Sequence, residues 1–182
     1  MKTRYFTVLL VLLIISGIFF GTKNSYAQRS TAKNNDIAVD FVNFLVNNTF
    51  TLQYEFKATS TTSFLIRGEY ITKNTGTATG VTSALGVGGA WRFYILDSRA
   101  LAGFSVAPAI DLFFFKNTNL SRNNIVFSVG ADAAYKFFFD QFTVEPTFGL
   151  REGIVPGTNP PPGENTFTGI YPIVSVYLGW AW

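Results

Sequence analysis

Nine ionisable residues interrupt segments that are otherwise apolar, aromatic or small. They comprise five acids and four bases: Glu55, Glu69, Asp111, Asp132, Glu145, Arg67, Arg92, Lys136 and Arg151. If these segments are β-strands, successive side chains point to opposite faces, and the charged residues share the inner face of a closed sheet. Buried charges must pair or carry a heavy desolvation cost, so we predict a salt-bridge core. Clustered buried ionisable groups also mark binding or proton-relay sites. The spacing of these residues does not distinguish such a site from a salt-bridge core.

Enzymatic chemistry has few candidate residues in this chain. It contains no His and no Cys. Lipid hydrolases and acyltransferases generally rely on His as the general base. Ser105, Ser128 and Ser175 therefore lack an activating partner. Asp132 with Glu145 is then the one acid–base pair left, and we predict that the protein is not an enzyme.

Composition also excludes most metal chemistry. Imidazole and thiolate sites require residues that the chain lacks, and disulfides and a lipoprotein anchor need Cys. A calcium site built from loop carboxylates would have few ligands, chiefly Glu152 and Glu164. We therefore predict no metal site and no cofactor.

Eight segments have the composition and length of strands that cross a bilayer at a tilt. They are 37–46, 49–56, 62–71, 83–95, 101–115, 124–138, 142–151 and 170–182. None shows a helical period over a comparable distance. The predicted fold is all-β, an eight-stranded antiparallel transmembrane β-barrel. We expect two irregularities: a bulge at Pro146, and a first strand in which Asp40 and Asn43 cannot both face inward without a bulge.

The last segment alternates up to an aromatic residue at the C-terminus. Leu178, Trp180 and Trp182 lie on its apolar face. This ending is typical of outer-membrane barrels, and we predict that these three residues are an assembly signal. The partners expected on that basis are the barrel assembly machinery, periplasmic chaperones and outer-membrane lipid.

The first 27 residues have the pattern of a secretory signal peptide. Lys2 and Arg4 precede an apolar run over 6–20, and small residues stand at 25 and 27. An uncleaved anchor is the alternative, since the run is near the lower limit for a spanning helix. We predict cleavage before Gln28, a flexible tail over 28–36 and a barrel over 37–182. Cleavage removes three of the 14 basic residues and leaves 11 against 11 acidic, so nucleic acid is not an expected partner.

The connections between strands alternate in length. Those after the second, fourth and sixth strands are short, and those after the third, fifth and seventh, over 72–82, 116–123 and 152–169, are longer. Short turns on one side and long loops on the other are typical of outer-membrane barrels with both termini in the periplasm. The expected location is the cell outer membrane, after export through the inner membrane.

Several short stretches carry a resemblance to a known group. They are 54–56 (YEF), 92–94 (RFY), 130–135 (GADAAY), 144–150 (VEPTFGL) and 178–182 (LGWAW). On these the chain resembles small eight-stranded outer-membrane proteins of the OmpA and OmpX kind, especially an uncharacterised family of that architecture. Ala134 and Trp182 depart from the usual Gly and Phe. The resemblance implies an integral barrel exposed at the cell surface and transfers no catalytic residues.

Two functions are consistent with this pattern. The first is a role in envelope structure or surface interaction. In this role the outer loops contact an unidentified extracellular ligand, and the lumen is filled by side chains and conducts nothing. The second is a binder or conduit for small hydrophobic ligands, with possible lining residues Tyr94, Phe113, Tyr171 and Tyr177. A third, a soluble periplasmic lipocalin-like carrier, conflicts with the large apolar patch that the outer face would present to water.

Overall fold

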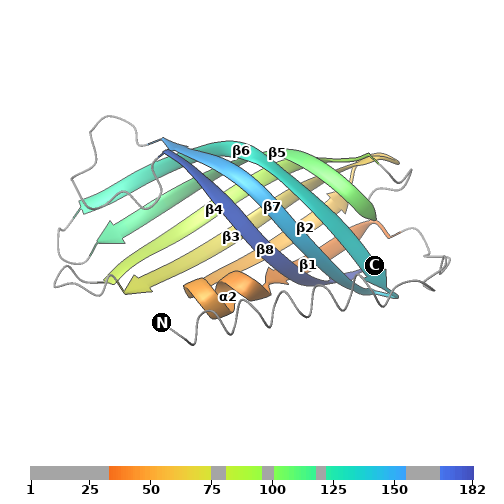
Figure 1. The fold of residues 1–182 in the computed structure, drawn as a ribbon, viewed down its shortest axis with the longest axis horizontal. Coiled ribbons are helices and arrows are strands. Elements are labelled where there is room, and N and C mark those ends of the chain that lie inside the picture. Colours follow the sequence, from red (N-terminus) through yellow and green to blue (C-terminus); the bar gives the residue numbers. More distant parts are fainter. Residues whose placement is uncertain (1–32, 75–80, 96–100, 118–121, 155–168) are drawn as a thin grey trace. The chain divides into compact units, whose positions relative to one another are not determined.

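The computed structural model describes residues 33–74, 81–95, 101–117, 122–154 and 169–182. Within these ranges the elements are β1 (Asn35–Asp40), α2 (Phe41–Asn47), β2 (Thr49–Lys57), β3 (Thr62–Asn74), β4 (Val81–Tyr94), β5 (Gly103–Asn117), β6 (Arg122–Phe139), β7 (Phe142–Ile154) and β8 (Gly169–Ala181). Each strand pairs antiparallel with the next, and β8 pairs with β1, so the sheet closes into a barrel (Figure 1). The predicted fold class is confirmed.

The two ends of the barrel are distinguished by the strands that begin and end there. At the end that we call the terminal end, the Trp182 carbonyl accepts hydrogen bonds from the Asn34 and Asn35 N–H groups at 2.9 and 3.0 Å. At the opposite end, which we call the loop end, β3, β5 and β7 finish and β4, β6 and β8 begin. The predicted signal peptide over 1–27 lies outside the described residues. No helix in the described ranges is both long and apolar enough to span a bilayer.

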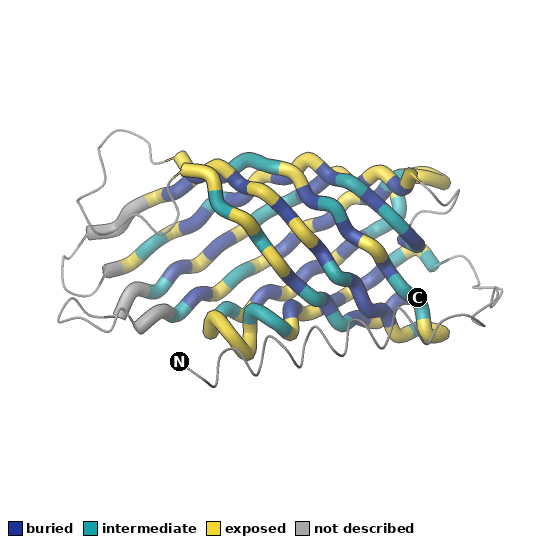
Figure 2. Tube along the Cα trace, viewed as in Figure 1, coloured by how far each residue is buried: buried dark blue, intermediate teal, exposed yellow. Residues whose placement is uncertain are grey.

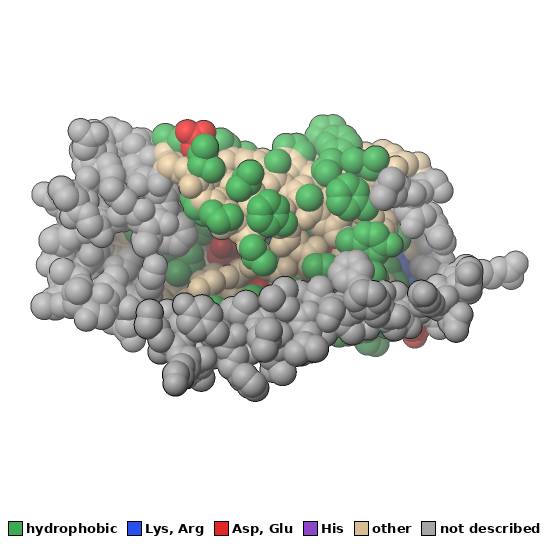
Figure 3. Space-filling view, viewed as in Figure 1, with side chains coloured by type: hydrophobic (Ala, Val, Ile, Leu, Met, Phe, Trp, Pro, Cys, Tyr) green, Lys and Arg blue, Asp and Glu red, His purple; other side chains and the backbone are tan. Residues whose placement is uncertain are grey.

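Burial alternates along the strands with a period of two (Figure 2). On β2, for example, Gln53 and Glu55 are buried while Leu52 and Tyr54 are exposed. Most buried side chains on the inside are polar or charged. Apolar side chains cover the outside, as the face drawn in Figure 3 shows. This inversion of the usual soluble pattern is expected when the barrel is surrounded by lipid.

Aromatic rings form a continuous row on the outer face of β2, β3 and β4 near the terminal end. Neighbouring ring centroids lie 5.3 to 6.4 Å apart in the order Trp182, Tyr54, Phe56, Phe64, Trp91 and Phe93. Aromatic girdles of this kind occupy the boundary between lipid and water. The C-terminal residue is thus part of the girdle.

The first strand differs from its prediction. It begins at Asn35, inside the expected tail, and ends at Asp40, after which the chain forms α2 where a strand to residue 46 was predicted. Asp40 caps the helix, since its side chain accepts a hydrogen bond from the Asn43 N–H at 3.1 Å. Asn48 ends the helix in the left-handed conformation, with φ 50°. Both residue types favour helix ends, which explains why the alternation stops here.

The bulge predicted at Pro146 is wrong. Pro146 pairs in register with Val176 of β8. Toward β6, the pairs Ala134↔Thr147 and Phe137↔Val144 keep one register on both sides of the proline, and only the pairing between them is interrupted. Proline removes a ladder donor without requiring an extra residue, so the strand stays regular.

Candidate functional site: two buried charge clusters

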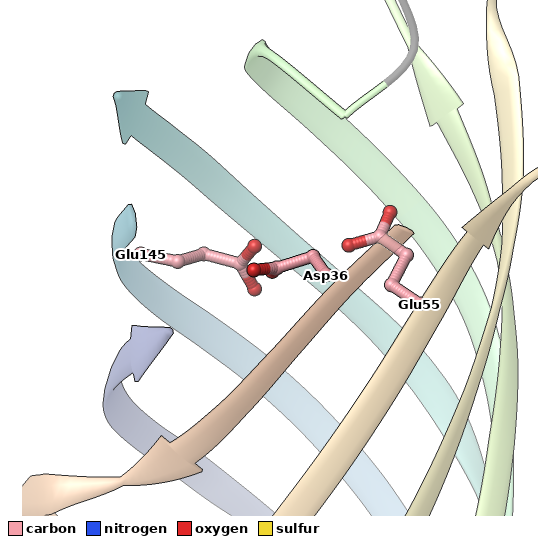
Figure 4. Close-up of side chains that lie close together, drawn as sticks. All are labelled: Asp36, Glu55 and Glu145. Atoms are coloured by element: carbon pink, nitrogen blue, oxygen red, sulfur yellow. The ribbon is translucent and has the colours of Figure 1, made fainter. Parts of the chain in front are cut away.

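The first group of charges, which we call the terminal cluster, lies in the lumen near the terminal end. It contains Asp36 of β1, Glu55 of β2, Arg92 of β4, Lys136 of β6 and Glu145 of β7, all almost completely buried. The three carboxylates point toward one another (Figure 4). The inward face of five strands therefore converges on one point in the lumen.

Lys136 occupies the centre of this cluster. Its Nζ atom lies 2.5 Å from Asp36 Oδ2, 2.5 Å from Glu55 Oε2 and 3.1 Å from Glu145 Oε2. Arg92 binds Glu145 through both Nη atoms, at 2.7 and 2.9 Å, and Glu55 at 2.8 Å. Charge-assisted and bidentate pairs of this kind are the strongest hydrogen bonds available to side chains.

Neutral groups complete the hydrogen bonding of the acids. The Tyr94 hydroxyl donates to Glu55 Oε1 at 2.6 Å, and the Ser63 hydroxyl donates to the same oxygen. The Thr143 hydroxyl donates to Asp36 Oδ1 at 3.0 Å. Because the carboxylate oxygens have partners on several sides, the cluster is bonded as a closed network.

The second group, which we call the central cluster, lies closer to the loop end. Asp111 accepts from Arg67 Nε at 2.7 Å and from Arg151 Nε at 2.9 Å. Asp132 lies 2.7 Å from both Nη atoms of Arg151 and 3.5 Å from Arg67 Nη1. Glu69, whose side chain is 17% exposed, lies 3.5 Å from Arg67 Nε. Among the described residues, Arg67 Nη2 has no hydrogen-bond partner.

Glycines on neighbouring strands make room for the central cluster. A Cβ atom at Gly88 would collide with Asp111 Oδ1 and lie 3.0 Å from Arg67 Nε. A Cβ at Gly149 would collide with Asp132 Oδ1. These two positions require glycine because a charged side chain crosses directly over the backbone.

The terminal cluster has the ligands of a cation site but already holds a cation. Oxygens of Asp36, Glu55 and Glu145 lie within 4.8 Å of one another, a spacing that suits a metal ion. Lys136 Nζ contacts all three of these carboxylates. The ammonium group therefore takes the place that a metal ion would occupy.

The predicted acid–base pair is separated by the fold. Asp132 belongs to the central cluster and Glu145 to the terminal cluster, and each is engaged by bases of its own cluster. Ser128 Oγ donates to Asp111 at 3.4 Å, an acceptor already bonded to two arginines, and Ser175 Oγ accepts from Asn43 at 2.9 Å. These contacts belong to the hydrogen-bonded networks inside the barrel.

The structure places all nine of the predicted lumen charges on the inner face and divides them between the two clusters. It adds Asp36, which sequence reasoning assigned to the tail. The signal for Asp36 was present in the alternation of Asp36, Ala38 and Asp40 with apolar Ile37 and Val39, which extends the first strand toward the N-terminus.

The four aromatic residues considered as a ligand lining do not form one group. Tyr94 belongs to the terminal cluster through its bond to Glu55. Phe113 packs with Ile71, Ala84 and Val126 in an apolar layer toward the loop end. Tyr177 is buried and pairs in register with Glu145, and Tyr171 is half-buried close to the start of β8.

The predicted C-terminal signal forms the outer face of β8 beside β1. Leu178 pairs with Val39, Trp180 pairs with Ile37, and the Trp182 ring lies 6.4 Å from that of Tyr54. Their role in assembly stays a prediction. Glu152 is exposed on β7, and Glu164 lies outside the described residues.

A closed antiparallel barrel with an apolar outside and a charged inside belongs to the class of transmembrane β-barrels. Among solved structures, the chain is similar to the backbone structure of the Yersinia pestis outer membrane protein Ail in a phospholipid bilayer nanodisc. The TM-score is 0.51 at 10% sequence identity, and the match covers 82% of this chain and 99% of that one. At this identity the similarity shows the fold, and it confirms the resemblance to small outer-membrane barrels at that level.

Neither protein-family models nor curated proteins match the chain.

Proposed function

We propose that the protein is an integral outer-membrane barrel that acts in envelope structure or surface interaction through its loop end. The observation that carries this proposal is the pair of ion-paired clusters across the lumen. The terminal cluster joins five strands, and the central cluster joins β3, β5, β6 and β7. With the inside occupied by bonded charges, we place the surface for a macromolecular partner at the loop end.

The outer face supports residence in a membrane. Large apolar side chains such as Leu85, Ile110 and Ile170 are 62, 56 and 77% exposed. A soluble carrier would present this surface to water as an apolar patch of the kind that soluble monomers avoid. In a bilayer the same surface contacts acyl chains at no cost, which makes outer-membrane lipid the immediate partner.

The lumen supports a role without conduction or catalysis. At the level of the two clusters, the interior of an eight-stranded barrel is only wide enough for side chains to fill it. An ion entering the terminal cluster would have to separate Lys136 or Arg92 from buried carboxylates, and breaking a buried pair costs about 3–5 kcal/mol. The carboxylates are committed to bases, so the network is not available as a general acid or base.

Two measurements test this proposal. The first is electrical recording across planar lipid bilayers that contain the purified barrel, and we expect no conductance steps above those of protein-free membranes. The second compares a strain that lacks the protein with the complemented strain for uptake of an apolar fluorescent dye through the outer membrane. A role in envelope structure or surface interaction predicts faster dye uptake without the protein. Stable ion-conducting steps, or slower uptake in the deletion strain, would refute it.

A binder or conduit for small apolar ligands is the second candidate. The observation that favours it is the apolar layer of Ile71, Ala84, Phe113 and Val126 on the loop-end side of the central cluster. Slower dye uptake in the deletion strain is the result that this candidate predicts, so the same experiment separates the two.

A further inference from the structure

The barrel wall is interrupted on one side. The ladder between β1 and β8 ends at Asp40↔Tyr177, although β8 extends toward the loop end as far as Gly169. Past Asp40 the chain continues as α2, which packs against β8, β2 and β3 (Figure 1) and contacts β8 at Val174 and Ser175. We call the contact between α2 and this unpaired edge of β8 the α2 seam.

The backbone of β8 is adapted to this interruption. Trp182 donates its N–H to Asn35 on the β1 side, whereas Ala181 donates to Gln141 on the β7 side. Even-numbered residues of β8 thus direct their peptide groups to the seam, in agreement with the Val174 carbonyl, which accepts from Asn43 Nδ2. Pro172 falls on the same edge and has no N–H there. An edge that faces lipid must limit its unpaired donors, and a proline does so.

The helix presents two different faces. Asp40, Asn43 and Asn47 are joined by side-chain hydrogen bonds at 2.6 Å along one polar row. Phe41, Phe44 and Leu45 are about half exposed, at 45, 54 and 54%. The Phe44 ring meets the outward-facing ring of Phe50 at 6.4 Å, which places the apolar face on the outside of the barrel. The helix is therefore amphipathic, with its apolar side toward lipid.

Within the part of the chain that the structure describes, the side-chain hydrogen bonds of α2 to β8 come from Asn43. Asn43 Nδ2 donates to the Val174 carbonyl at 3.0 Å and contacts Ser175 Oγ at 2.9 Å. Elsewhere the wall is held by long ladders, such as the one that joins β5 and β6 from Gly103↔Lys136 to Asn117↔Arg122. The α2 seam is thus a weakly held part of the wall, bounded by the helix cap at Asp40 and the left-handed Asn48.

The two sides of the seam are apolar. On the outside, Ile170 and Val174 of β8 are 77 and 59% exposed beside the apolar face of α2. On the inside, Tyr171 and Ile173 are only half-buried, while Ser175 and Tyr177 further along β8 are fully buried. The apolar layer around Phe113 lies at the same end of the lumen, and the central cluster closes the lumen below it.

From this arrangement we infer that the α2 seam is a lateral entry through which one acyl chain of a bilayer lipid reaches the loop-end part of the lumen. Ile170 and Val174, on the outer side of the seam, belong to the lipid-facing surface of the barrel, so the molecule that contacts them is an acyl chain. The central cluster prevents passage beyond the apolar layer. This inference concerns the wall and is independent of what the loop end contacts.

The test uses a disulfide that closes the seam. The chain has no cysteine. Asn43 Nδ2 lies 2.9 Å from Ser175 Oγ, so we choose Asn43→Cys with Ser175→Cys as the pair to link α2 to β8. The protein is placed in phosphatidylcholine nanodiscs that contain a phospholipid with a photoactivatable diazirine on its acyl chain. Mass spectrometry then compares labelling of inward-facing Ile173 and Phe113 with that of outward-facing Leu85.

We expect labelling of the inward positions in the parent and in the reduced variant, and a loss of about tenfold when the disulfide forms. Labelling of Leu85 should not change. A matched disulfide across the regular ladder, Ser105→Cys with Ala134→Cys, should leave the inward labelling as it is. Inward positions that stay unlabelled in the parent, or that are labelled equally with the seam closed, would overturn the inference.

A second variant covers the case in which the cysteine pair does not fold. Asn43→Ala removes both contacts to β8 and should raise inward labelling several-fold, because each lost hydrogen bond weakens the closed state by a few-fold or more. Asn47→Ala leaves both contacts to β8 in place and should raise it less. Equal labelling in Asn43→Ala and the parent would contradict the role of Asn43 in holding the seam closed.

Discussion

Replacing Lys136 by alanine removes the centre of the terminal cluster. The ammonium lies 2.5, 2.5 and 3.1 Å from three buried carboxylates. Without it, Arg92 is the base left beside Glu55 and Glu145, and among the described residues Asp36 keeps the Thr143 hydroxyl as its side-chain partner. Removing one partner of a buried ion pair costs about 3–5 kcal/mol, so we expect Lys136→Ala to lower the free energy of unfolding by about 4 kcal/mol.

The assay is urea unfolding of the barrel in lipid vesicles, followed by tryptophan fluorescence. With a urea dependence of about 2 kcal/mol per molar, a loss of this size lowers the midpoint by about 2 M. Lys116→Ala is the matched control, because Lys116 is exposed on β5 and surface substitutions change stability by less than about 0.5 kcal/mol. If Lys136→Ala and Lys116→Ala unfold at the same urea concentration, the placement of Lys136 as the buried centre is wrong.

Three further predictions follow from the same structure. In Lys136→Ala the three carboxylates are left without their central cation. Millimolar Ca²⁺ should therefore raise the unfolding midpoint of this variant and not that of the parent. Equal responses would show that the three carboxylates do not form a cation site. Gly88→Ala should destabilise the barrel by about 1–3 kcal/mol in the same unfolding assay, because the added Cβ collides with Asp111. A Cβ at Gly68 meets no atom within 4 Å, so Gly68→Ala should be neutral. Similar losses of stability in both variants would contradict this packing. Asp40→Ala should cost about 1 kcal/mol by removing the cap of α2, and an unchanged midpoint would show that the cap contributes nothing.

The strands and their faces could be predicted because the alternation of side chains is a local property of each segment. Along β2, Gln53 and Glu55 alternate with Leu52 and Tyr54, and this pattern is visible in the sequence alone. Pro146 shows the limit of such reasoning. A proline signals a missing hydrogen-bond donor, but the sequence does not show whether the pairing with the neighbouring strand keeps its register.

The composition of the two clusters could not be predicted, because pairing inside a barrel depends on how all eight strands are staggered. Arg92 meets Glu145 across the lumen from β4 to β7, two strands that are not neighbours in the sheet. The helix α2 was missed for a different reason. A helix of seven residues is too short for periodicity to show, and its signal lies in Asp40 and Asn48 at its two ends.

The central claim is that the apolar face of the barrel lies in lipid, and the native tryptophans report on it directly. All three, Trp91, Trp180 and Trp182, lie on the outer face and are 47, 51 and 50% exposed. The measurement is fluorescence quenching of the unmodified protein in vesicles, with bromine on the lipid acyl chains in one sample and aqueous iodide in the other. Stronger quenching by brominated lipid than by aqueous iodide is the predicted result. Strong quenching by iodide with none from the lipid would contradict the account.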